Sequence, residues 1–138
     1  MAGTLVDANV LMDVLTADPT WLPWSSAQLN TARRTGVVII NPIVCAEIAP
    51  LFDFDWTKLD RWMRPGLFKR EALPFHASVI AGAAHRQYRR NGGNRNSPMP
   101  DFYIGAHAEA SGYTLLTRDV QRYRTYFPRV SLIVPPGF

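Results

Sequence analysis

The chain has almost no cysteine: Cys45 is the only one among its 138 residues. A single thiol excludes a disulfide within the chain and a zinc site built on cysteine ligands. A chain of this length buries roughly two-thirds of the surface of its unfolded form and needs no such crosslink. Its composition, 47% hydrophobic and 19% charged, is that of a globular protein. We therefore expect a single domain that spans residues 1–138.

Long hydrophobic runs are also missing. The longest stretches without a charged residue have about 14 residues, for example residues 72–85, which is too short for a membrane span. The first seven residues have no basic segment followed by an apolar one, so we expect no signal peptide. These absences favour a cytoplasmic protein that does not associate with membranes.

Lysine is also scarce, with Lys58 and Lys69 the only two. Thirteen of the 15 basic residues are arginine, and together with 11 acidic residues they give a formal net charge of +4. Arginine binds phosphate through two parallel hydrogen bonds, which lysine cannot do. The charge balance is therefore a weak indication of a polyanionic partner.

Hydrophobic periodicity and turn residues divide the chain into alternating strands and helices. Short apolar runs predict strands at residues 4–7, 37–40, 113–116 and 130–134. Apolar residues at helical spacing predict helices at residues 8–16, 21–34, 43–52, 55–63, 75–90, 97–112 and 118–126. Residues 67–73 fit either an extended segment or a loop. This alternation favours an α/β fold with a parallel sheet.

Two carboxylates follow predicted strands. Asp7 ends the first strand, and Asp119 comes three residues after the third. Ligands of open α/β sheets bind beyond the carboxyl ends of the strands. The alternative for each residue is an ordinary acid at the start of a helix.

Two further carboxylates lie on predicted helices. Glu47 is the only charged residue between Thr35 and Phe52, and an unpaired carboxylate on so apolar a helix is costly. The alternative is that Glu47 reaches solvent or pairs with an arginine. Asp101 begins a helix directly after two prolines suited to a first turn, where its alternative role is to complement the helix dipole.

These four acids would meet at one edge of the sheet. Oxygen ligands without cysteine or a histidine pair favour Mg²⁺ or Mn²⁺ over Zn²⁺. Without a metal, two such charges ~5 Å apart repel each other by roughly 3 kcal/mol at an effective dielectric constant near 20. A bound divalent cation would reverse the sign of this energy.

Five motifs follow one another along nearly the whole chain: Leu5-Val-Asp7-Ala-Asn9-Val-Leu11, Ala46-Glu47-Ile48, Pro100-Asp101-Phe-Tyr-Ile-Gly-Ala-His-Ala108, Leu115-Leu-Thr117-Arg-Asp119 and Tyr123-Arg-Thr-Tyr-Phe127-Pro128. This ordered set resembles PIN-domain ribonucleases, most closely the VapC toxins of bacterial toxin–antitoxin pairs. The resemblance implies a PIN-like three-layer α/β/α sandwich with a central, mostly parallel sheet of four to five strands. Pro50, three residues after Glu47, departs from the pattern and should shorten or kink that helix.

The resemblance also implies an activity: an endoribonuclease toxin of a VapBC-type pair, which hydrolyses RNA phosphodiester bonds with a metal-activated water. The ligands of one or two Mg²⁺ or Mn²⁺ ions would be Asp7, Glu47, Asp101 and Asp119. Thr117 would add a catalytic hydroxyl, and Asn9 would support the first Asp loop by hydrogen bonds. Such toxins usually form homodimers, are silenced by a cognate antitoxin, and act on targets that include tRNA and ribosomal RNA.

Several other residues have an alternative explanation. Four arginines lie within ten residues without any acid among them: Arg86, Arg89, Arg90 and Arg95. They and Arg118, which precedes Asp119, could bind RNA phosphates. The alternative for each is an arginine on a solvated helix face. We expect Asp13 to be a surface acid and His107 to be structural rather than catalytic.

Two other functions remain open at this point. A small phosphatase with an Asp nucleophile fits less well, because the opening Asp7-Ala-Asn9 lacks a second Asp and Lys58 and Lys69 are the only lysines. A non-catalytic RNA- or protein-binding module on a PIN scaffold would not need four acids.

Overall fold

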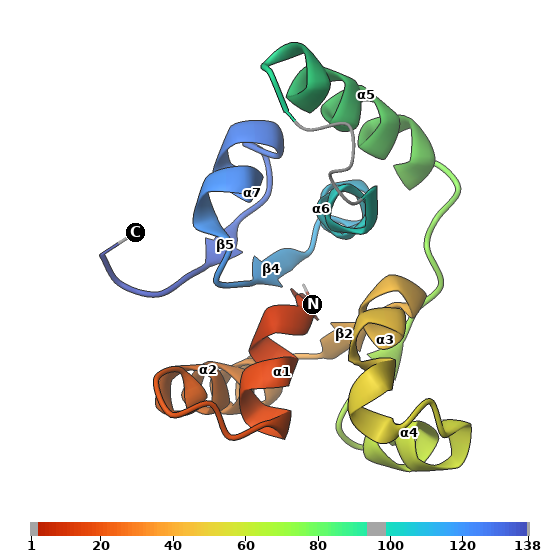
Figure 1. The fold of residues 1–138 in the computed structure, drawn as a ribbon, viewed down its shortest axis with the longest axis vertical. Helices are drawn as coiled ribbons and strands as arrows, with labels where there is room; N and C mark the ends of the chain where they lie inside the picture. Colours follow the sequence, from red (N-terminus) through yellow and green to blue (C-terminus); the bar gives the residue numbers. More distant parts are fainter. Residues whose placement is uncertain (1–2, 94–98, 138) are drawn as a thin grey trace.

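Strands and helices alternate in the computed structural model, which describes residues 3–93 and 99–137 (Figure 1). The strands are β1 (Thr4–Val6), β2 (Val38–Ile40), β3 (Lys69–Arg70), β4 (Thr114–Leu116) and β5 (Leu132–Ile133). The helices are α1 (Ala8–Leu15), α2 (Leu22–Thr35), α3 (Pro42–Ile48), η1 (Ala49–Phe52), α4 (Trp56–Trp62), α5 (Ala77–Arg90), α6 (Met99–Ser111) and α7 (Val120–Tyr126), of which η1 is a 3-10 helix. Residues 97 and 98, the expected start of the sixth helix, lie outside the described residues.

The strands form one five-stranded sheet in the order β3-β2-β1-β4-β5, and every neighbouring pair is parallel. The prediction of an α/β fold with a parallel sheet is therefore confirmed. Of residues 67–73, for which an extended segment and a loop were both open, only Lys69–Arg70 form a strand, β3, and the remainder is turn or loop.

Helices cover both faces of the sheet, in the α/β/α arrangement that was expected. Parallel strands are joined by right-handed crossovers, so the face on which a connecting helix lies depends on whether the next strand is added to one side of the sheet or to the other. When the chain changes the side to which it adds strands, its helices change face. That change occurs after β3. Figure 1 shows α1 and α2 on one side of the strands and α5, α6 and α7 on the other. Helix α3 packs against both α1 and α6.

The central strands form the core. Their apolar runs are almost fully buried, since the side chains of β1, β2 and β4 pack between the two helical layers: Leu5, Val6, Ile39, Ile40, Leu115 and Leu116. Each such side chain contributes about 1.5–3 kcal/mol through burial. This rigid centre fixes where β1 and β4 end, and thus where the polar residues that follow them lie.

The predicted helix at residues 43–52 is shorter than expected. α3 ends at Ile48, and η1 continues to Phe52 as a tighter 3-10 helix. Pro50 has no N–H to donate to the carbonyl four residues earlier, so the α-helical ladder stops there. The expected effect of Pro50 on this helix is confirmed. No helix in the described parts of the chain is both long enough and apolar enough to cross a membrane.

Candidate active site

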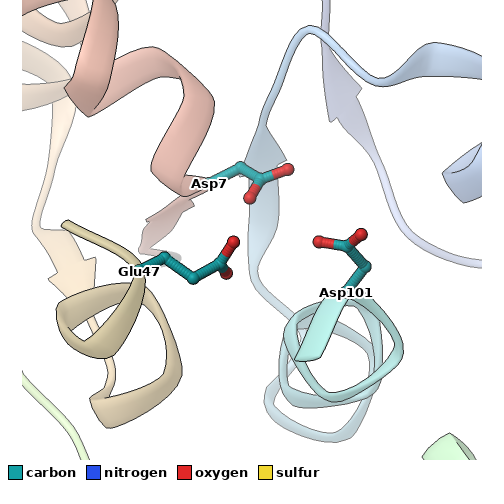
Figure 2. A group of neighbouring side chains, drawn as sticks. All are labelled: Asp7, Glu47 and Asp101. Atoms are coloured by element: carbon teal, nitrogen blue, oxygen red, sulfur yellow. The ribbon is translucent and has the colours of Figure 1, made fainter. Parts of the chain in front are cut away.

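Three carboxylates from different parts of the chain converge at one edge of the sheet. Asp7 lies between β1 and α1, Glu47 lies near the end of α3, and Asp101 lies in the first turn of α6. One oxygen from each lies within 4.8 Å of the other two. Figure 2 shows the three side chains pointing toward one another from three separate elements. The expected meeting of these three acids is therefore what the fold produces.

Asp7 is the most tightly held of the three. Its side chain is 3% exposed, and its Oδ1 accepts the N–H of Ala8 at 2.8 Å as the N-cap of α1. Its Oδ2 accepts hydrogen bonds from the hydroxyls of Thr117 at 2.8 Å and Tyr123 at 3.2 Å, and from Asn9 Nδ2 at 3.3 Å. Four donors from three segments thus fix the orientation of this carboxylate.

Thr117 and Asn9 tie the loops after β1 and β4 together. Asn9 Nδ2 lies 3.4 Å from Thr117 Oγ1, and Asn9 Oδ1 accepts the N–H of Arg118 at 3.2 Å. Thr117 Oγ1 in turn accepts the N–H of Asp119 at 3.0 Å. Hydrogen bonds of these two side chains thus connect the start of α1 to the loop before α7.

Burial, followed by the charges of neighbouring acids, weakens the acidity of the three carboxyl groups. Burial, then the charges of Asp7 and Asp101, raises the pKa of Glu47 from 4.5 to about 7. Burial, together with the charge of Asp101, raises the pKa of Asp7 from 3.8 to about 6, although its hydrogen bonds oppose the shift. Burial also raises the pKa of Asp101 despite the nearby guanidinium of Arg122. The protein therefore holds these three groups together against an electrostatic cost.

The donor set fits a hard divalent cation. Among the described residues, Glu47 Oε1 is buried and has no hydrogen-bond partner, an arrangement that costs free energy unless a ligand satisfies it. All the nearby ligand atoms are carboxylate oxygens, which Mg²⁺ and Mn²⁺ prefer. A divalent cation would satisfy the unpartnered oxygen of Glu47 and offset the repulsion, so the residues present suit such an ion.

Asp119 lies beside this group rather than in it. Its carboxylate is 37% exposed, and Oδ2 accepts a hydrogen bond from Arg122 Nη1 at 3.1 Å. The same Nη1 donates to Asp101 Oδ2, so Arg122 bridges the two carboxylates. The structure thus brings three of the four predicted ligands together directly and connects the fourth through an arginine.

Two residues of the site were not among the predicted ligands and catalytic residues. Arg122 follows Asp119 by three residues, a helical spacing that could have indicated the ion pair. Tyr123 belongs to the last motif, but its side chain is fully buried and only the fold places its hydroxyl on Asp7. Spacing therefore offered a signal for Arg122 and none for Tyr123.

Arg118 and Asp13 are placed differently from expectation. Asp13 was predicted to be a surface acid, but it is 2% exposed because this face of α1 packs into the fold. Its two oxygens pair with Arg118 at 2.7 and 2.9 Å, and Ser25 donates to it at 2.6 Å. The guanidinium of Arg118 also lies over the ring of Trp21. This arginine is therefore already engaged within the protein, while its side chain remains 27% exposed.

The other predicted RNA contacts lie on α5. Arg86, Arg89 and Arg90 are exposed and line one hollow together with His85. Within the described parts of the chain, no carboxylate forms an ion pair with these three arginines. Arg95 lies outside the described residues.

Comparisons with known proteins agree with this fold. The sequence model of a family described as PIN domain matches residues 4–128. The fold is similar to that in a crystal structure of VapBC2 from Rickettsia felis bound to a DNA fragment from their promoter, with a TM-score of 0.73, 17% identity, and coverage of 96% of this chain and 98% of that chain. It is also similar to DNA-bound VapBC from Salmonella typhimurium, with a TM-score of 0.71, 14% identity, and coverage of 97% and 98%. For FitAcB from Neisseria gonorrhoeae the TM-score is 0.68, the identity 19%, and the coverage 94% and 96%. No curated protein sequence matches the chain.

Proposed function

This chain belongs to the PIN domain family, and from that premise we propose that it is a Mg²⁺- or Mn²⁺-dependent endoribonuclease of the VapC type. The observation that carries the proposal is the convergence of Asp7, Glu47 and Asp101 around a buried oxygen of Glu47 that no described residue satisfies. A structural acid pair would not leave such an atom without a partner. A site built to hold a cation would.

The three acids would hold the ion, and the residues around them would keep the acids in place. When bound, a divalent cation polarises a phosphoryl oxygen and lowers the pKa of a water molecule. Asp7 keeps its orientation because Thr117 and Tyr123 donate to its Oδ2. Its Oδ1 accepts only the N–H of Ala8 among described residues and thus retains a lone pair for a ligand. We propose the catalytic set Asp7, Glu47, Asp101, Asp119 and Thr117, with Asn9 in support.

Arg122 is suited to balance charge beside the acids. It is 24% exposed at its side chain and reaches Asp101 and Asp119 with one nitrogen, which leaves its other donors unused by these two acids. A phosphate of the substrate would meet those donors at the rim of the site. Arg122 would therefore help an acidic site to accept an anionic substrate.

RNA would extend from the acids toward α5. A hollow lined by Asp119, Arg122, Tyr88 and Tyr126 lies between α7 and α5. The centroids of the two tyrosine rings are 5.6 Å apart, and the rings meet edge to face. Beyond this hollow, the exposed arginines of α5 would neutralise phosphates: Arg86, Arg89 and Arg90. Family resemblance favours tRNA or ribosomal RNA as the substrate class.

We further propose that the protein is the toxin of a toxin–antitoxin pair. The similar structures whose titles name VapBC support this role, since the sequence motifs resemble those of the VapC toxins of toxin–antitoxin pairs. Its partner would be a cognate antitoxin, and the toxin would be a cytoplasmic homodimer of single-domain chains.

The alternative functions gain no support from the site. In a phosphatase, Asp7 would act as a nucleophile, but Asp7-Ala-Asn9 lacks the second Asp, and Lys58 and Lys69 are the only lysines. A non-catalytic binding module would not require three acids to be held together at an electrostatic cost.

Cleavage of total RNA tests the proposal. We expect cleavage by the wild-type protein in Mn²⁺, and none in EDTA or by Asp7→Ala. Equal cleavage in all three cases would indicate a contaminating nuclease. Intact RNA without growth arrest on expression would favour a binding module, and release of phosphate from a small phosphomonoester would favour a phosphatase. Growth arrest that is relieved by co-expressing the protein encoded immediately upstream would support the toxin role.

A further inference from the structure

The helices that carry Glu47 and Asp101 approach each other at a second point. Asn41, directly before α3, is 1% exposed, and His107 in α6 is fully buried. The distance between Asn41 Nδ2 and His107 Nδ1 is 3.0 Å. Glu47 follows Asn41 by six residues, and His107 follows Asp101 by six. The two helices therefore run antiparallel. They are held by a hydrogen bond at one point and carry two repelling carboxylates at another, and six residues separate these points by about 9 Å along each helix.

The hydrogen bonds around His107 are compatible with one tautomer. Asn41 Oδ1 accepts the N–H of Val44 at 2.9 Å as the N-cap of α3, so the amide of Asn41 turns its NH₂ group toward His107. His107 Nδ1 must then accept, and its Nε2 carries the proton and donates to Glu71 Oε1 at 3.1 Å. The hydroxyl of Tyr113 donates to both oxygens of Glu71, at 2.8 and 2.7 Å. A continuous chain of donors and acceptors thus links the start of α3, the middle of α6 and the end of β3.

This arrangement opposes the repulsion in the acidic site. Glu47 is repelled by Asp7 and Asp101, and α3 ends soon after it, at Ile48. The repulsion acts to move the end of α3 away from α6. The buried bond between Asn41 and His107 holds the start of the same short helix, so it limits how far Glu47 can shift.

We propose that His107 is a positioning residue for the acidic site, acting through Asn41 and α3 on the carboxylate of Glu47. The inference rests on the proposed function, in that the three acids hold a divalent cation. Without the bond between His107 and Asn41, the carboxylates would be less well placed before the ion arrives. The ion would then bind more weakly, even in a protein that is fully folded.

Two substitutions of His107 separate its two hydrogen bonds. The amide of an asparagine lies at the position of Nδ1, so His107→Asn keeps an acceptor for Asn41 and loses the contact with Glu71. The amide of a glutamine lies near the position of Nε2, so His107→Gln keeps a donor for Glu71 and leaves Asn41 without its acceptor. We expect the Mn²⁺ dissociation constant, measured by calorimetry on folded protein without RNA, to rise about 10- to 100-fold for His107→Gln. For His107→Asn it should stay close to the wild-type value.

A milder variant on the other helix tests the same bond. Asn41→Ser keeps an oxygen that can cap α3 but removes the NH₂ group that faces His107. We expect it to weaken Mn²⁺ binding as His107→Gln does, and it decides the matter if His107→Gln does not fold. The matched control is His76→Gln, a change at an exposed histidine just before α5, which should bind Mn²⁺ like the wild type.

The outcomes distinguish this inference from the proposed function. If the wild-type protein does not bind Mn²⁺, the proposed metal site is wrong, and the inference falls with it. If the wild type binds Mn²⁺ and folded His107→Gln and Asn41→Ser bind it equally well, only the positioning role is refuted. An equal loss of affinity in His107→Asn and His107→Gln would also refute it, because the loss would then come from altered packing of α6.

Discussion

Replacing Glu47 by glutamine removes one charge from the acidic site with little change of shape. Oε1 of Glu47 is buried and has no partner among the described residues, so the substitution breaks no hydrogen bond at that atom. The pKa of Glu47 is about 7 in the folded protein, against 4.5 for an ordinary glutamate. This difference corresponds to about 3 kcal/mol. Because the side chain is only half-buried and solvent screens it, we expect an effect of about 1–2 kcal/mol.

The sign follows from proton binding. A carboxyl group with a higher pKa in the folded protein binds more protons when folded than when unfolded, at pH values between the two pKa values. The metal-free wild type therefore loses stability as the pH rises from 4.5 to about 7, and above that the loss is complete. Asp7, with its pKa raised to about 6, adds a loss of the same sign in both proteins. Glu47→Gln cannot ionise at this position and does not lose the stability that ionisation of Glu47 costs the wild type. The variant should therefore be the more stable protein at neutral pH.

Urea unfolding in EDTA measures this difference in free energy. Near pH 7.5, Glu47→Gln should be about 1–2 kcal/mol more stable than the wild type, and near pH 4.5 the two should be equal. Saturating Mn²⁺, at about 100 times its dissociation constant, should stabilise the wild type by about 2.7 kcal/mol and the variant by much less. Glu109→Gln, at a partly exposed acid on α6, is the control.

Two results would refute the reasoning. A stability difference of the same size near pH 4.5 and pH 7.5 would show that the substitution changes packing rather than charge. A variant that is less stable than the wild type at neutral pH without metal would show that Glu47 is not repelled by its neighbours.

Three further substitutions have expected effects on the free energy of unfolding, each measurable by urea denaturation. Thr117→Val removes a buried hydroxyl that hydrogen-bonds a carboxylate of the site, and should cost about 1–3 kcal/mol; no loss would show that the hydroxyl is replaceable. Gly105→Ala places a Cβ 2.5 Å from ring atoms of Phe127 and should cost about 1–3 kcal/mol, whereas unchanged stability would mean that the ring shifts freely. Arg118→Ala leaves the buried carboxylate of Asp13 without its charge partner and should cost about 3 kcal/mol or more; a loss below about 1 kcal/mol would point to a solvent-exposed pair.

Much of the fold follows from local sequence. The β-branched run at residues 37–40 and the apolar run at residues 4–7 can hardly be anything other than buried strands in so short a chain. β3 could not be recognised in the same way, because Lys69 and Arg70 are charged and exposed. Its strand conformation comes from pairing with β2, where Ile39 and Ile40 supply the neighbouring backbone. Edge strands with no buried face leave no hydrophobic pattern to detect.

The candidate site shows the same division. Asp7 and Glu47 stand out in the sequence because a carboxylate among apolar residues is costly unless it is paired or binds a ligand. The prolines at residues 98 and 100 mark Asp101 as part of the start of a helix. The side-chain partners leave no such mark. Asp13 looks like any acid on an amphipathic helix, and only the packing of α1 reveals that it is buried against Arg118.

The sequence by itself therefore determined the alternation of strands and helices and the acids that would gather at one edge of the sheet, since both depend on local pattern and on the common direction of parallel strands. The tertiary structure alone decided how those acids are held. It joined Asp101 to Asp119 through Arg122, left Glu47 Oε1 without a partner, and connected His107 to Asn41. These contacts depend on the directions of side chains from elements far apart in the chain, which no local pattern encodes.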